Sequence, residues 1–510
     1  MTQKVVILDF GSQYTQLIAR RVRELGVFSE ILSPSTSMEQ LQQEDPVAII
    51  LSGGPSSIEN LNAPRPDPDI LQLDVPLLGI CYGMQWLAEY EGGEIGSSQR
   101  REYGKASVTL ENPSDLLNDE MEGSQVWMSH GDHVDVPPDG YEILARSDGT
   151  IAAIGSAEHR RYGLQFHPEV THTVYGETVL ENFLYTIAGC RGDWSPGEFV
   201  TETTSWMEKT IGSDRVICAV SGGVDSSVLA VLLNAAVGEQ SIPIFIDTGL
   251  LRFDDIENVT EILSKELDLP IRYHDSSDQF LQALEGITDP EEKRRTIGHQ
   301  FIETFQEVAN EYDNLRFLAQ GTLYPDVIES EMVTGPSSTI KTHHNVGGLP
   351  EEMDLHLIEP FREMFKDEVR EVGRYLGIPD RILGRHPFPG PGLAVRIIGE
   401  VTRERLQMVR ESDRIFTEAL HENNQYDKVW QALAVLLPVN TVGVMGDRRT
   451  YEHVIALRAV VSVDGMTADW ADLPTELLQR ASSAIVNQVH GINRVVYDIT
   501  SKPPGTIEWE

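Results

Sequence analysis

A cysteine stands where a sharp turn between a strand and a helix would present it. Cys81 lies between Gly79 and Gly83, after an apolar run and before the helical pattern 84–90. Glycine on either side lets the chain reverse tightly, so the side chain between them projects from the end of the strand. The positive end of the helix dipole favours a thiolate there. The spacing predicts a nucleophile, and a buried structural cysteine is the alternative.

A base and an acid for this nucleophile follow later in the chain. His167 ends the strand pattern 162–166, and Glu169 comes two residues after it. An imidazole can exchange a proton with a thiol, and a nearby carboxylate can orient the imidazole. A Gly-Gly-Pro turn after an early apolar strand supplies free N–H groups, so we expect the N–H groups of Gly54 and Tyr82 to form an oxyanion hole.

With these motifs, residues 4–190 resemble the class I glutamine amidotransferases. The resemblance implies that Cys81, His167 and Glu169 form a triad that releases ammonia from glutamine through a glutamyl thioester. The residues that match the glutamine-binding segments of the family are Gln85, Ser129, His130 and Asp132. Gln85 has a second interpretation, as an ordinary residue on a helix surface.

A second motif has the composition of a phosphate-binding loop. Residues 221–227 read Ser-Gly-Gly-Val-Asp-Ser-Ser, after the strand pattern 216–220 and before a helix that runs through Val237. Paired glycines and a helix N-terminus form a nest of N–H groups that binds anions. No lysine follows the glycines, so this is not the Walker loop. Asp225 would repel phosphate unless a cation lies between them, which implies Mg²⁺.

This loop resembles that of the N-type ATP pyrophosphatases, which cleave ATP between its α and β phosphates. The strand 244–249 resembles the adenosine-contacting segment of the same family, although Asp247 could simply end a strand. The resemblance assigns ATP binding to Ser221, Gly222, Gly223, Val224, Asp225, Ser226, Ser227, Asp247 and Gly321.

Further segments extend the resemblance over the whole chain, to the family of glutamine-hydrolysing GMP synthetases. They are residues 167–173, 321–330, 341–350, 385–393 and 502–510. The resemblance implies a carbon–nitrogen ligase of de novo guanine nucleotide synthesis. Such an enzyme aminates xanthosine 5′-monophosphate (XMP) to GMP through adenylyl-XMP, with glutamine or free ammonia as nitrogen donor, and releases AMP, pyrophosphate and glutamate.

The same resemblance assigns the remaining site residues. Those expected to bind XMP are Arg294, Arg385, Pro389, Gly390, Lys502, Ile507 and Glu508. Lys341 and Lys366 are expected to belong to a lid that closes over ATP. For the arginines and for Lys366, a solvated surface position is the alternative interpretation.

The element pattern predicts an α/β protein that contains two doubly wound parallel-sheet domains and a smaller α+β domain. Apolar strands alternate with helices in both larger parts, which is typical of parallel sheets covered on both faces. Stretches 106–110, 142–147 and 151–156 look like antiparallel additions. A linker pattern at 193–197 and a Pro/Gly-rich break at 386–392 suggest domains at 1–192, 193–396 and 397–510, and the resemblance implies that the last one forms a homodimer.

The amino-acid composition limits the classes of binding partner that we expect. The 510 residues carry 80 Asp and Glu against 40 Lys and Arg, a net charge of −40, which argues against binding to nucleic acid or an anionic membrane. Lysine is scarce, with 9 residues against 31 arginines. Adaptation to concentrated salt and ordinary acidic drift both explain this balance. Three scattered cysteines, no apolar run of membrane-spanning length and no signal peptide favour a cytoplasmic enzyme.

Three other functions share part of these motifs. Glutamine-dependent NAD synthetase has a similar phosphate loop, but its nitrilase-type amidase motifs are absent. A tRNA-thiolating enzyme would need a basic surface and usually further cysteines. A nucleotide sensor that lost catalysis would not need a complete residue set at each motif.

Overall fold

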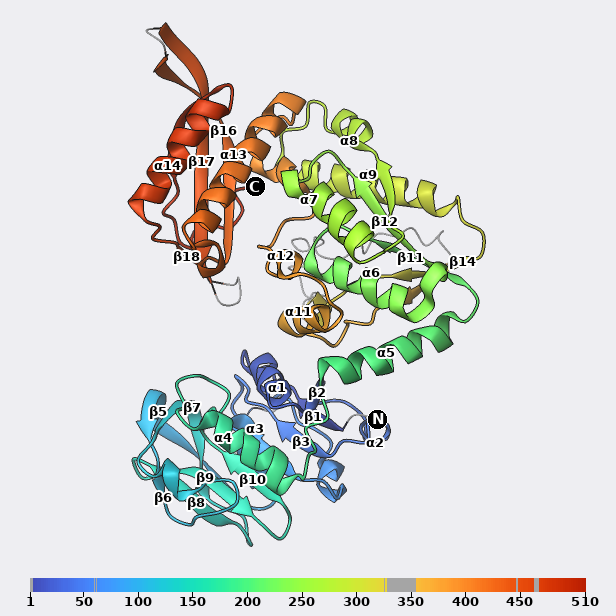
Figure 1. Ribbon diagram of the computed structural model, residues 1–510. Coiled ribbons are helices and arrows are strands. Elements are labelled where there is room, and N and C mark those ends of the chain that lie inside the picture. Colours follow the sequence, from blue (N-terminus) through green and yellow to red (C-terminus); the bar gives the residue numbers. More distant parts are fainter. Residues whose placement is uncertain are drawn as a thin grey trace. The chain divides into compact units, whose positions relative to one another are not determined.

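The computed structural model describes residues 3–58, 60, 62–324, 326–327, 355–445, 448–462 and 467–510, with the backbone alone at 97–103, 445 and 448 (Figure 1). The chain forms two compact units, residues 1–198 and 199–510, which we describe separately. Within the described ranges, no helix is both long enough and apolar enough to cross a membrane.

The first unit is built on a mixed eight-stranded sheet with the order β2-β1-β3-β4-β10-β9-β8-β6. The first five strands in this order are parallel, and the last three are antiparallel. The strands are β1 (Lys4–Leu8), β2 (Phe28–Leu32), β3 (Ala48–Leu51), β4 (Leu77–Ile80), β6 (Thr109–Leu110), β8 (Glu142–Ser147), β9 (Thr150–Ser156) and β10 (Arg161–Leu164). The predicted antiparallel additions are therefore confirmed.

Helices and a separate ribbon complete this unit. The helices are α1 (Thr15–Glu24), α2 (Met38–Gln43), α3 (Tyr82–Tyr90) and α4 (Gly176–Glu181), with a π-helical continuation at Asn182–Ile187 and 3₁₀ turns at Pro68–Gln72 and Asp119–Met121. Strands β5 (Glu94–Ser107) and β7 (Gln125–Val136) pair antiparallel as a two-stranded ribbon. Every residue of the central strands β3 and β4 is buried, as their continuous apolar sequence predicts.

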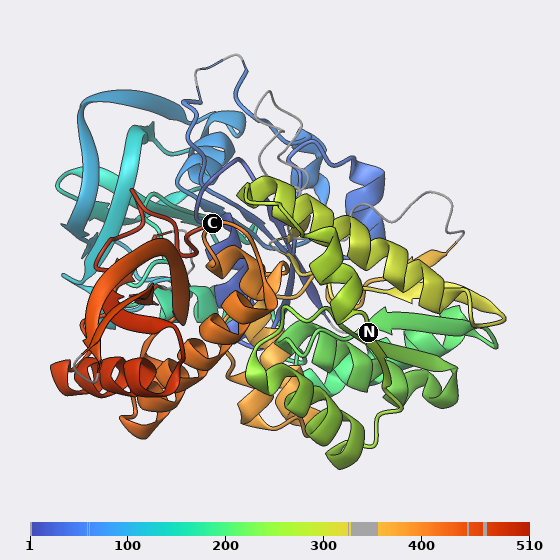
Figure 2. The same cartoon turned by 90° about the horizontal axis from the view of Figure 1, so that it is seen from above.

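The second unit begins with a parallel sheet of five strands in the order β13-β12-β11-β14-β15. Its strands are β11 (Arg215–Ala219), β12 (Ser241–Asp247), β13 (Arg272–Asp275), β14 (Leu315–Ala319) and β15 (His356–Ile358). The helices here are α5 (Pro196–Ile211), α6 (Val224–Val237), α7 (Phe253–Glu257), α8 (Ser277–Ala283), α9 (Pro290–Ala309), α11 (Lys366–Tyr375) and α12 (Asp380–Leu383), with a π-helical turn at Asn258–Glu266 and a 3₁₀ turn at Gly238–Gln240. Figure 2 shows α9, in yellow-green, as the long helix of this part.

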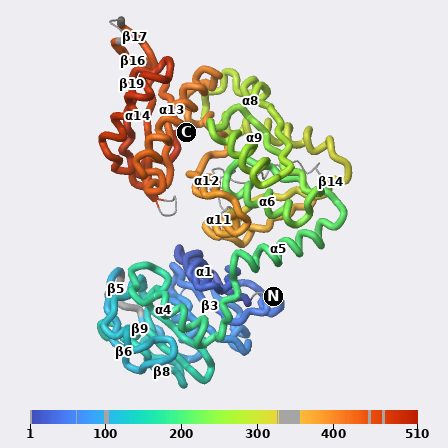
Figure 3. Tube along the Cα trace, in the orientation of Figure 1, coloured from blue at the N-terminus to red at the C-terminus, as the bar shows by residue number. Residues whose placement is uncertain are grey.

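The C-terminal part of this unit is a small α+β layer. Strands β16 (Gln431–Met445) and β17 (Arg448–Val461) form a long antiparallel hairpin, which extends beyond its neighbours in Figure 3. Strand β18 (Asp469–Trp470) pairs antiparallel with β17, and β19 (Ile492–Tyr497) pairs parallel with it. The helices are α13 (Arg403–Glu422) and α14 (Thr475–Gln488), with 3₁₀ turns at Gly392–Arg396 and Tyr426–Lys428. Within β16, the sequence pattern predicts a strand only at 441–445, the last third of the strand.

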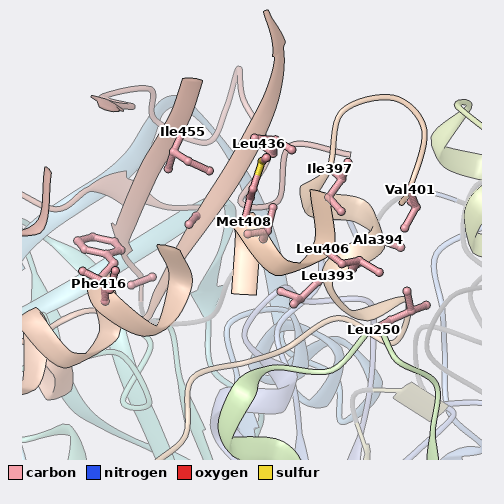
Figure 4. Close-up of a cluster of buried hydrophobic side chains, with 14 of the residues drawn as sticks. Leu250, Leu393, Ala394, Ile397, Val401, Leu406, Met408, Phe416, Leu436 and Ile455 are labelled. Carbon is pink, nitrogen blue, oxygen red and sulfur yellow. The ribbon is translucent and has the colours of Figure 1, made fainter. Parts of the chain in front are cut away.

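One hydrophobic core joins the parallel sheet to the C-terminal layer. It contains Ile217 and Phe305 of the sheet region together with Phe416, Leu436 and Ile455. Figure 4 shows part of it, where residues from the 3₁₀ turn 392–396 and from α13 meet the hairpin. Because both parts contribute to the same buried cluster, side chains of the C-terminal layer can take part in sites beside the parallel sheet.

Two glycines permit the close crossing that carries Cys81. A Cβ on Gly79 would lie 2.6 Å from the carbonyl group of Gly83, and a Cβ on Gly83 would lie 2.4 Å from the carbonyl oxygen of Leu51. Both contacts are with backbone, which cannot move aside without shifting β3 or α3. The spacing of the two glycines therefore reflects the packing of helix against sheet.

We predict that Gly83→Ala destabilises the first unit by about 1–3 kcal/mol, the usual cost of overpacking. Denaturation followed by circular dichroism would measure the free energy of unfolding. Gly131→Ala is the matched control, because a Cβ there meets no atom within 4 Å. Equal stability of the two variants would contradict the packing argument.

Candidate active sites

Cys81 occupies a strained turn between β4 and α3. It has φ +50° and ψ −105°, an uncommon conformation for a residue with a side chain, and it is the N-cap of α3. Its Sγ lies 3.6 Å from the carbonyl oxygen of Ser129 and 3.6 Å from Nε2 of Gln165. The residue is only 4% exposed. The turn thus holds the thiol beside a polar group of β7 and another that directly follows β10.

His167 and Glu169 form a buried pair beside this thiol. Nδ1 of His167 lies 2.7 Å from Oε1 of Glu169, and both side chains are almost fully buried. Burial alone would lower the pKa of His167, but the Glu169 carboxylate and a hydrogen bond with Cys81 raise it to about 10. His167 therefore carries a proton at neutral pH, and a protonated imidazole beside a thiol stabilises the thiolate.

The backbone around the pair fixes its orientation. The N–H of His167 donates to the carbonyl of Trp127 at 3.0 Å, and the Thr173 hydroxyl donates to the His167 carbonyl at 2.7 Å. From α1, Nε of Arg21 donates to the carbonyl of Glu169 at 3.1 Å, and the Tyr14 ring meets the imidazole edge-on with centroids 5.1 Å apart. The position of the imidazole is thus set from several elements.

Both glycines of the Gly-Gly-Pro turn lie against this group. A Cβ on Gly53 would be 3.2 Å from Cε1 of His167 and 3.7 Å from Cβ of Cys81. A Cβ on Gly54 would be 2.9 Å from the carbonyl oxygen of Phe10 and 3.4 Å from Cγ of Tyr82. The structure therefore places the Gly-Gly-Pro turn beside the nucleophile, with Gly53 next to Cys81 and Gly54 next to Tyr82.

The predicted glutamine-binding residues converge on the same place. Nε2 of Gln85 donates to the carbonyl of Asp132 at 2.7 Å and approaches Oε1 of Gln165 at 3.4 Å. Gln85 is buried, so it is not a helix-surface residue. His130 is also buried, and burial together with nearby His133 lowers its pKa to about 4. Gln165, which contacts both Gln85 and the thiol, was not identified from the sequence; its place two residues before His167 was the available signal.

In the second unit the loop 221–227 folds as a nest at the N-terminus of α6. Gly222 has φ +76°, and Gly223 is the N-cap. The Ser221 and Ser226 hydroxyls lie 3.0 Å apart, and the Ser221 N–H donates to Ser226 Oγ at 3.1 Å. A positive φ at Gly222 turns successive N–H groups toward one side, as an anion nest requires.

Asp225 and Lys366 meet across this nest. Their Oδ2 and Nζ atoms are 3.3 Å apart, and a Cβ on Gly321 would lie 3.5 Å from Cβ of Asp225. Lys366 is the first residue of α11, and its ammonium reaches the loop through the contact with Asp225. It is therefore more than a solvated residue on a helix surface. Lys341, the other predicted lid residue, is outside the described residues, as is the rest of the segment 341–350.

Asp247 ends β12 next to the strand that leads into the nest. Its carboxylate accepts from the N–H of Gly249 at 2.8 Å and from the hydroxyl of Tyr273 at 2.7 Å. Both oxygens thus have partners within the protein. These bonds agree with the structural interpretation of Asp247, and its assignment to adenosine binding stays a prediction.

Arg385 directly precedes the Pro/Gly-rich segment 386–392 and contacts the nest. Nη1 of Arg385 donates to the carbonyl of Gly222 at 2.7 Å, and Nη2 pairs with Asp255. Beyond it, Pro389 and Gly390 precede the 3₁₀ turn 392–396, and a Cβ on Gly390 would meet no atom within 4 Å. Arg385 is therefore a largely buried partner of the phosphate loop, with a side chain 12% exposed, rather than a solvated surface residue.

The C-terminal tail runs back along the C-terminal layer. The Lys502 N–H and carbonyl pair with Ala468, and the Ile507 carbonyl accepts from Nε of Arg458 at 3.0 Å. Both oxygens of Glu508 are engaged by Arg396, at 3.1 and 2.9 Å. The tail is thus held by buried cations from other elements.

Further tail contacts come from residues that the sequence argument missed, apart from Arg294. Lys293 is fully buried and its Nζ lies 2.5 Å from Oε2 of Glu510, while Nη2 of Arg294 donates to the Glu510 main-chain oxygen at 2.5 Å. Burial lowers the pKa of Lys293 despite the opposing carboxylate. Nε2 of Gln431 donates to Glu508 at 2.6 Å. These residues lie far apart in sequence, and no local pattern connects them to the tail.

Comparison with known proteins finds family matches in three parts of the chain. Residues 6–187 match the family Glutamine amidotransferase class-I, residues 215–321 the Phosphoadenosine phosphosulfate reductase domain, and residues 418–509 the GMP synthase C terminal domain. The chain is 54% identical to the GMP synthase (glutamine-hydrolyzing) of Nitratidesulfovibrio vulgaris, over 99% of both chains. It is 55% identical to that of Chlorobium luteolum over 100% of both, and 53% identical to that of Aquifex aeolicus over 99% of both.

The chain belongs to the glutamine-hydrolysing GMP synthase family. It is a ligase that carries out the glutamine-dependent conversion of XMP to GMP, with an ATP-using pyrophosphatase domain. The predicted fold class, enzyme class and substrates are therefore confirmed. Membership of the GMP synthase family also excludes the NAD synthetase and tRNA-thiolating alternatives.

For this GMP synthase we predict that Cys81 alone among the three cysteines reacts with iodoacetamide in the native state. The pKa of Cys190 is raised to about 11 and that of Cys218 to about 12, both chiefly by burial. The pKa of His167 is raised to about 10, so an imidazolium stands beside the Cys81 thiol at neutral pH and favours its reaction. Mass spectrometry of the labelled peptides measures the rate at each site.

The Glu169→Gln variant tests the origin of this behaviour. Removing the carboxylate lowers the pKa of His167, so the variant loses the imidazolium as pH rises through the neutral range. We expect alkylation of Cys81 at pH 7 to slow by about tenfold, because the thiol loses the imidazolium that favours its reaction. An alkylation rate of Cys81 that is the same in the variant and in the parent would contradict the role of Glu169.

Proposed function

We propose that the buried triad of the first unit supplies ammonia to the synthesis of GMP. Cys81 Sγ attacks the side-chain amide carbon of glutamine, and the C–N bond breaks as His167 gives its proton to the departing nitrogen. The products are ammonia and a glutamyl thioester, which water hydrolyses to glutamate and the free thiol. The 2.7 Å contact between His167 and Glu169, beside a strained Cys81, is the observation that carries this proposal.

The same proposal assigns the surrounding polar groups. The N–H groups of Gly54 and Tyr82 would stabilise the negative charge on the amide oxygen in the transition state. Gln85, together with the β7 residues 129–132, would hold the substrate glutamine. Gln85 contacts Gln165, and Gln165 contacts the thiol. These contacts support the assignment because they connect the expected binding residue to the nucleophile.

In the second unit we propose that the nest at 221–227 holds the β and γ phosphates of ATP while XMP is activated. The C2 oxygen of XMP attacks the α phosphorus, pyrophosphate leaves, and adenylyl-XMP forms. Ammonia then adds to C2 and AMP departs. Lys366, 3.3 Å from Asp225, places a cation where negative charge moves onto pyrophosphate, and Gly321 and Asp247 would line the nucleotide.

The residues of the nest fit Mg²⁺ as a partner of ATP. Oδ1 of Asp225 is buried and has no hydrogen-bond partner within the described part of the chain. In the same part, no cluster of three or more acidic, histidine or cysteine side chains could hold a metal by itself. Mg²⁺ usually takes one or two carboxylates together with substrate phosphates, so Asp225 would hold it jointly with pyrophosphate. The ion would neutralise charge on the phosphates.

XMP would lie between the Pro/Gly-rich segment and the C-terminal tail. Pro389 and Gly390 follow Arg385, which touches the nest, while Glu508 is anchored by Arg396. The remaining assigned residues are Arg294, Lys502 and Ile507. We also propose a cytoplasmic location, where ATP and XMP are found, and the three domains 1–192, 193–396 and 397–510.

Separate variants test the two sites. Cys81→Ala should abolish GMP formation from glutamine while synthesis from added ammonium persists, since only the nitrogen source is lost. Asp225→Asn should reduce synthesis from either source by about 10²-fold or more, the scale for losing a group that stabilises transition-state charge. GMP and AMP release measure the two outcomes. Loss of both activities in Cys81→Ala would contradict the division of labour.

We further propose that the C-terminal layer forms a homodimer through the hairpin β16–β17. Val442 pairs with Tyr451 across the hairpin, and both side chains are exposed, as is nearby Val444. Contiguous exposed apolar side chains on a strand pair favour association.

Val444→Asp should convert the dimer into a monomer in sedimentation experiments, because a charge would be buried in the interface. Val174→Asp introduces the same change at an exposed valine of the other unit and serves as the control. A dimer that survives Val444→Asp would exclude this interface.

A further inference from the structure

Six ionised side chains form a continuous path through the second unit. They come from the loop after α12, the start of α7, helix α13, the 3₁₀ turn 392–396 and the tail. Three are guanidinium groups and three are carboxylates, so their charges balance: Arg252, Arg385, Arg396, Asp255, Asp413 and Glu508. All six side chains are at most 17% exposed.

The path starts at the phosphate nest. Arg385 donates from Nη1 to the carbonyl of Gly222 at 2.7 Å, while Nη2 pairs with Asp255. The other oxygen of Asp255 accepts from the backbone N–H of Arg252 at 2.7 Å. The orientation of the Gly222 peptide is therefore tied to the N-terminus of α7.

Asp413 is the central residue of the path. Its Oδ2 lies 2.9 Å from Nε of Arg252, and its Oδ1 lies 3.1 Å from Nη1 of Arg396. Oδ1 also accepts from the N–H of Ala434 in β16 at 3.3 Å. One carboxylate on α13 thus neutralises two buried arginines that come from different parts of the chain.

The path ends at the C-terminal tail. Arg396 binds both oxygens of Glu508, and Gln431 adds a third donor at 2.6 Å. The ring of Phe388 lies close to both arginines that contact Asp413. Its centroid is 4.9 Å from Cζ of Arg252 and 5.1 Å from Cζ of Arg396. Cations on an aromatic ring add attraction where water is excluded.

Such a path permits few arrangements. Arg385 and Arg396 each make two or more directed hydrogen bonds, and Arg252 forms an ion pair with Asp413. A buried charge that loses its partner is strongly destabilised. If the side chain at one end of the path moves, the neighbouring side chains must move with it, or one buried charge loses its partner. A contiguous network of this kind can transmit a preference between two sites when both ends contact ligands.

We propose that Asp413 is a positioning residue that couples the phosphate nest to the C-terminal tail, so that ATP and XMP favour each other's binding. The inference rests on the proposed function, in which the nest holds ATP and Glu508 contacts XMP. Asp413 acts through Arg252 and Arg396 and touches neither nucleotide itself.

Calorimetric titration of XMP with and without a non-hydrolysable ATP analogue tests the coupling. In the parent enzyme we expect the analogue to tighten XMP binding by about fivefold or more, the lower range of allosteric coupling. Asp413→Asn keeps the shape of the side chain and removes its charge. In this variant the ratio of the XMP dissociation constants without and with the analogue should fall to near one. Absence of coupling in the parent, or unchanged coupling in the variant, would overturn the proposal.

Glu418→Gln is the matched control. Glu418 lies on the same helix α13, is exposed, and pairs with Arg414 at 2.6 Å outside the path. Removing its charge should leave the coupling ratio unchanged. An equal loss of coupling in this control would mean that any charge change on α13 has the effect, which would contradict a role specific to Asp413.

Arg385→Lys gives a second route if Asp413→Asn does not fold. Lysine keeps the charge but carries its donors on a single atom, so it cannot hold Gly222 and Asp255 in the fixed directions of the two Nη atoms; coupling should fall in this variant as well. Hydrogen exchange on the parent enzyme needs no variant. The ATP analogue alone should slow exchange in residues 500–510, and unchanged exchange there would count against the path.

Glu508→Gln separates this inference from the proposed function. If the variant binds XMP as tightly as the parent does, the assignment of the tail to XMP is wrong. If the variant binds XMP weakly while Asp413→Asn keeps full coupling, the site assignment holds and the positioning role of Asp413 is wrong.

Discussion

The second unit depends on burying positive charge inside an acidic protein. The chain has a net charge of −40, yet the phosphate nest and the tail are joined by fully or nearly fully buried arginines. Although burial opposes ionisation, Glu508 and Asp413 raise the pKa of Arg396, and Asp255 does the same for Arg385. Paired in this way, the guanidinium groups remain charged in the interior, and the parallel sheet and the C-terminal layer are fastened to each other.

The first unit solves a related problem with a single pair. Desolvation alone would leave His167 neutral, and the Glu169 carboxylate reverses this because it lies 2.7 Å away in a site that excludes water. The strained backbone at Cys81 then fixes where the thiol meets the imidazolium. The nucleophile and the His167–Glu169 pair come from two distant places in the sequence, and the sheet order β4-β10 brings them together, since those strands are parallel neighbours.

The motifs could be recognised in the sequence because their chemistry is local. Contacts between residues far apart in the sequence could not be recognised in this way. The glycines around Cys81 and in the nest had visible spacing because turns and helix N-termini impose it over a few residues. The antiparallel strands of the first sheet were likewise predictable from short apolar runs. The links from Arg385 to Gly222 and from Arg396 to Glu508 span 163 and 112 residues, and a single sequence carries no periodicity that reports such contacts. Residues 431–440 of β16 were missed for another reason, because a continuous apolar run fits a helix or a strand.

The imbalance of 31 arginines to 9 lysines has a structural counterpart in these sites. A lysine ammonium can satisfy several acceptors only by clustering them around one atom, as Lys293 does with the carbonyl of Ile397 and the side chain of Glu510. A guanidinium presents donors in a rigid plane, so Arg458 can hold Asp498 and the tail carbonyls of Thr500 and Thr506 at once. Where one buried cation must fix several backbone groups in direction as well as charge, arginine is the residue that the geometry requires. The few lysines in these sites instead stand where a point charge suffices, and Lys366 opposite Asp225 is the example beside the nest.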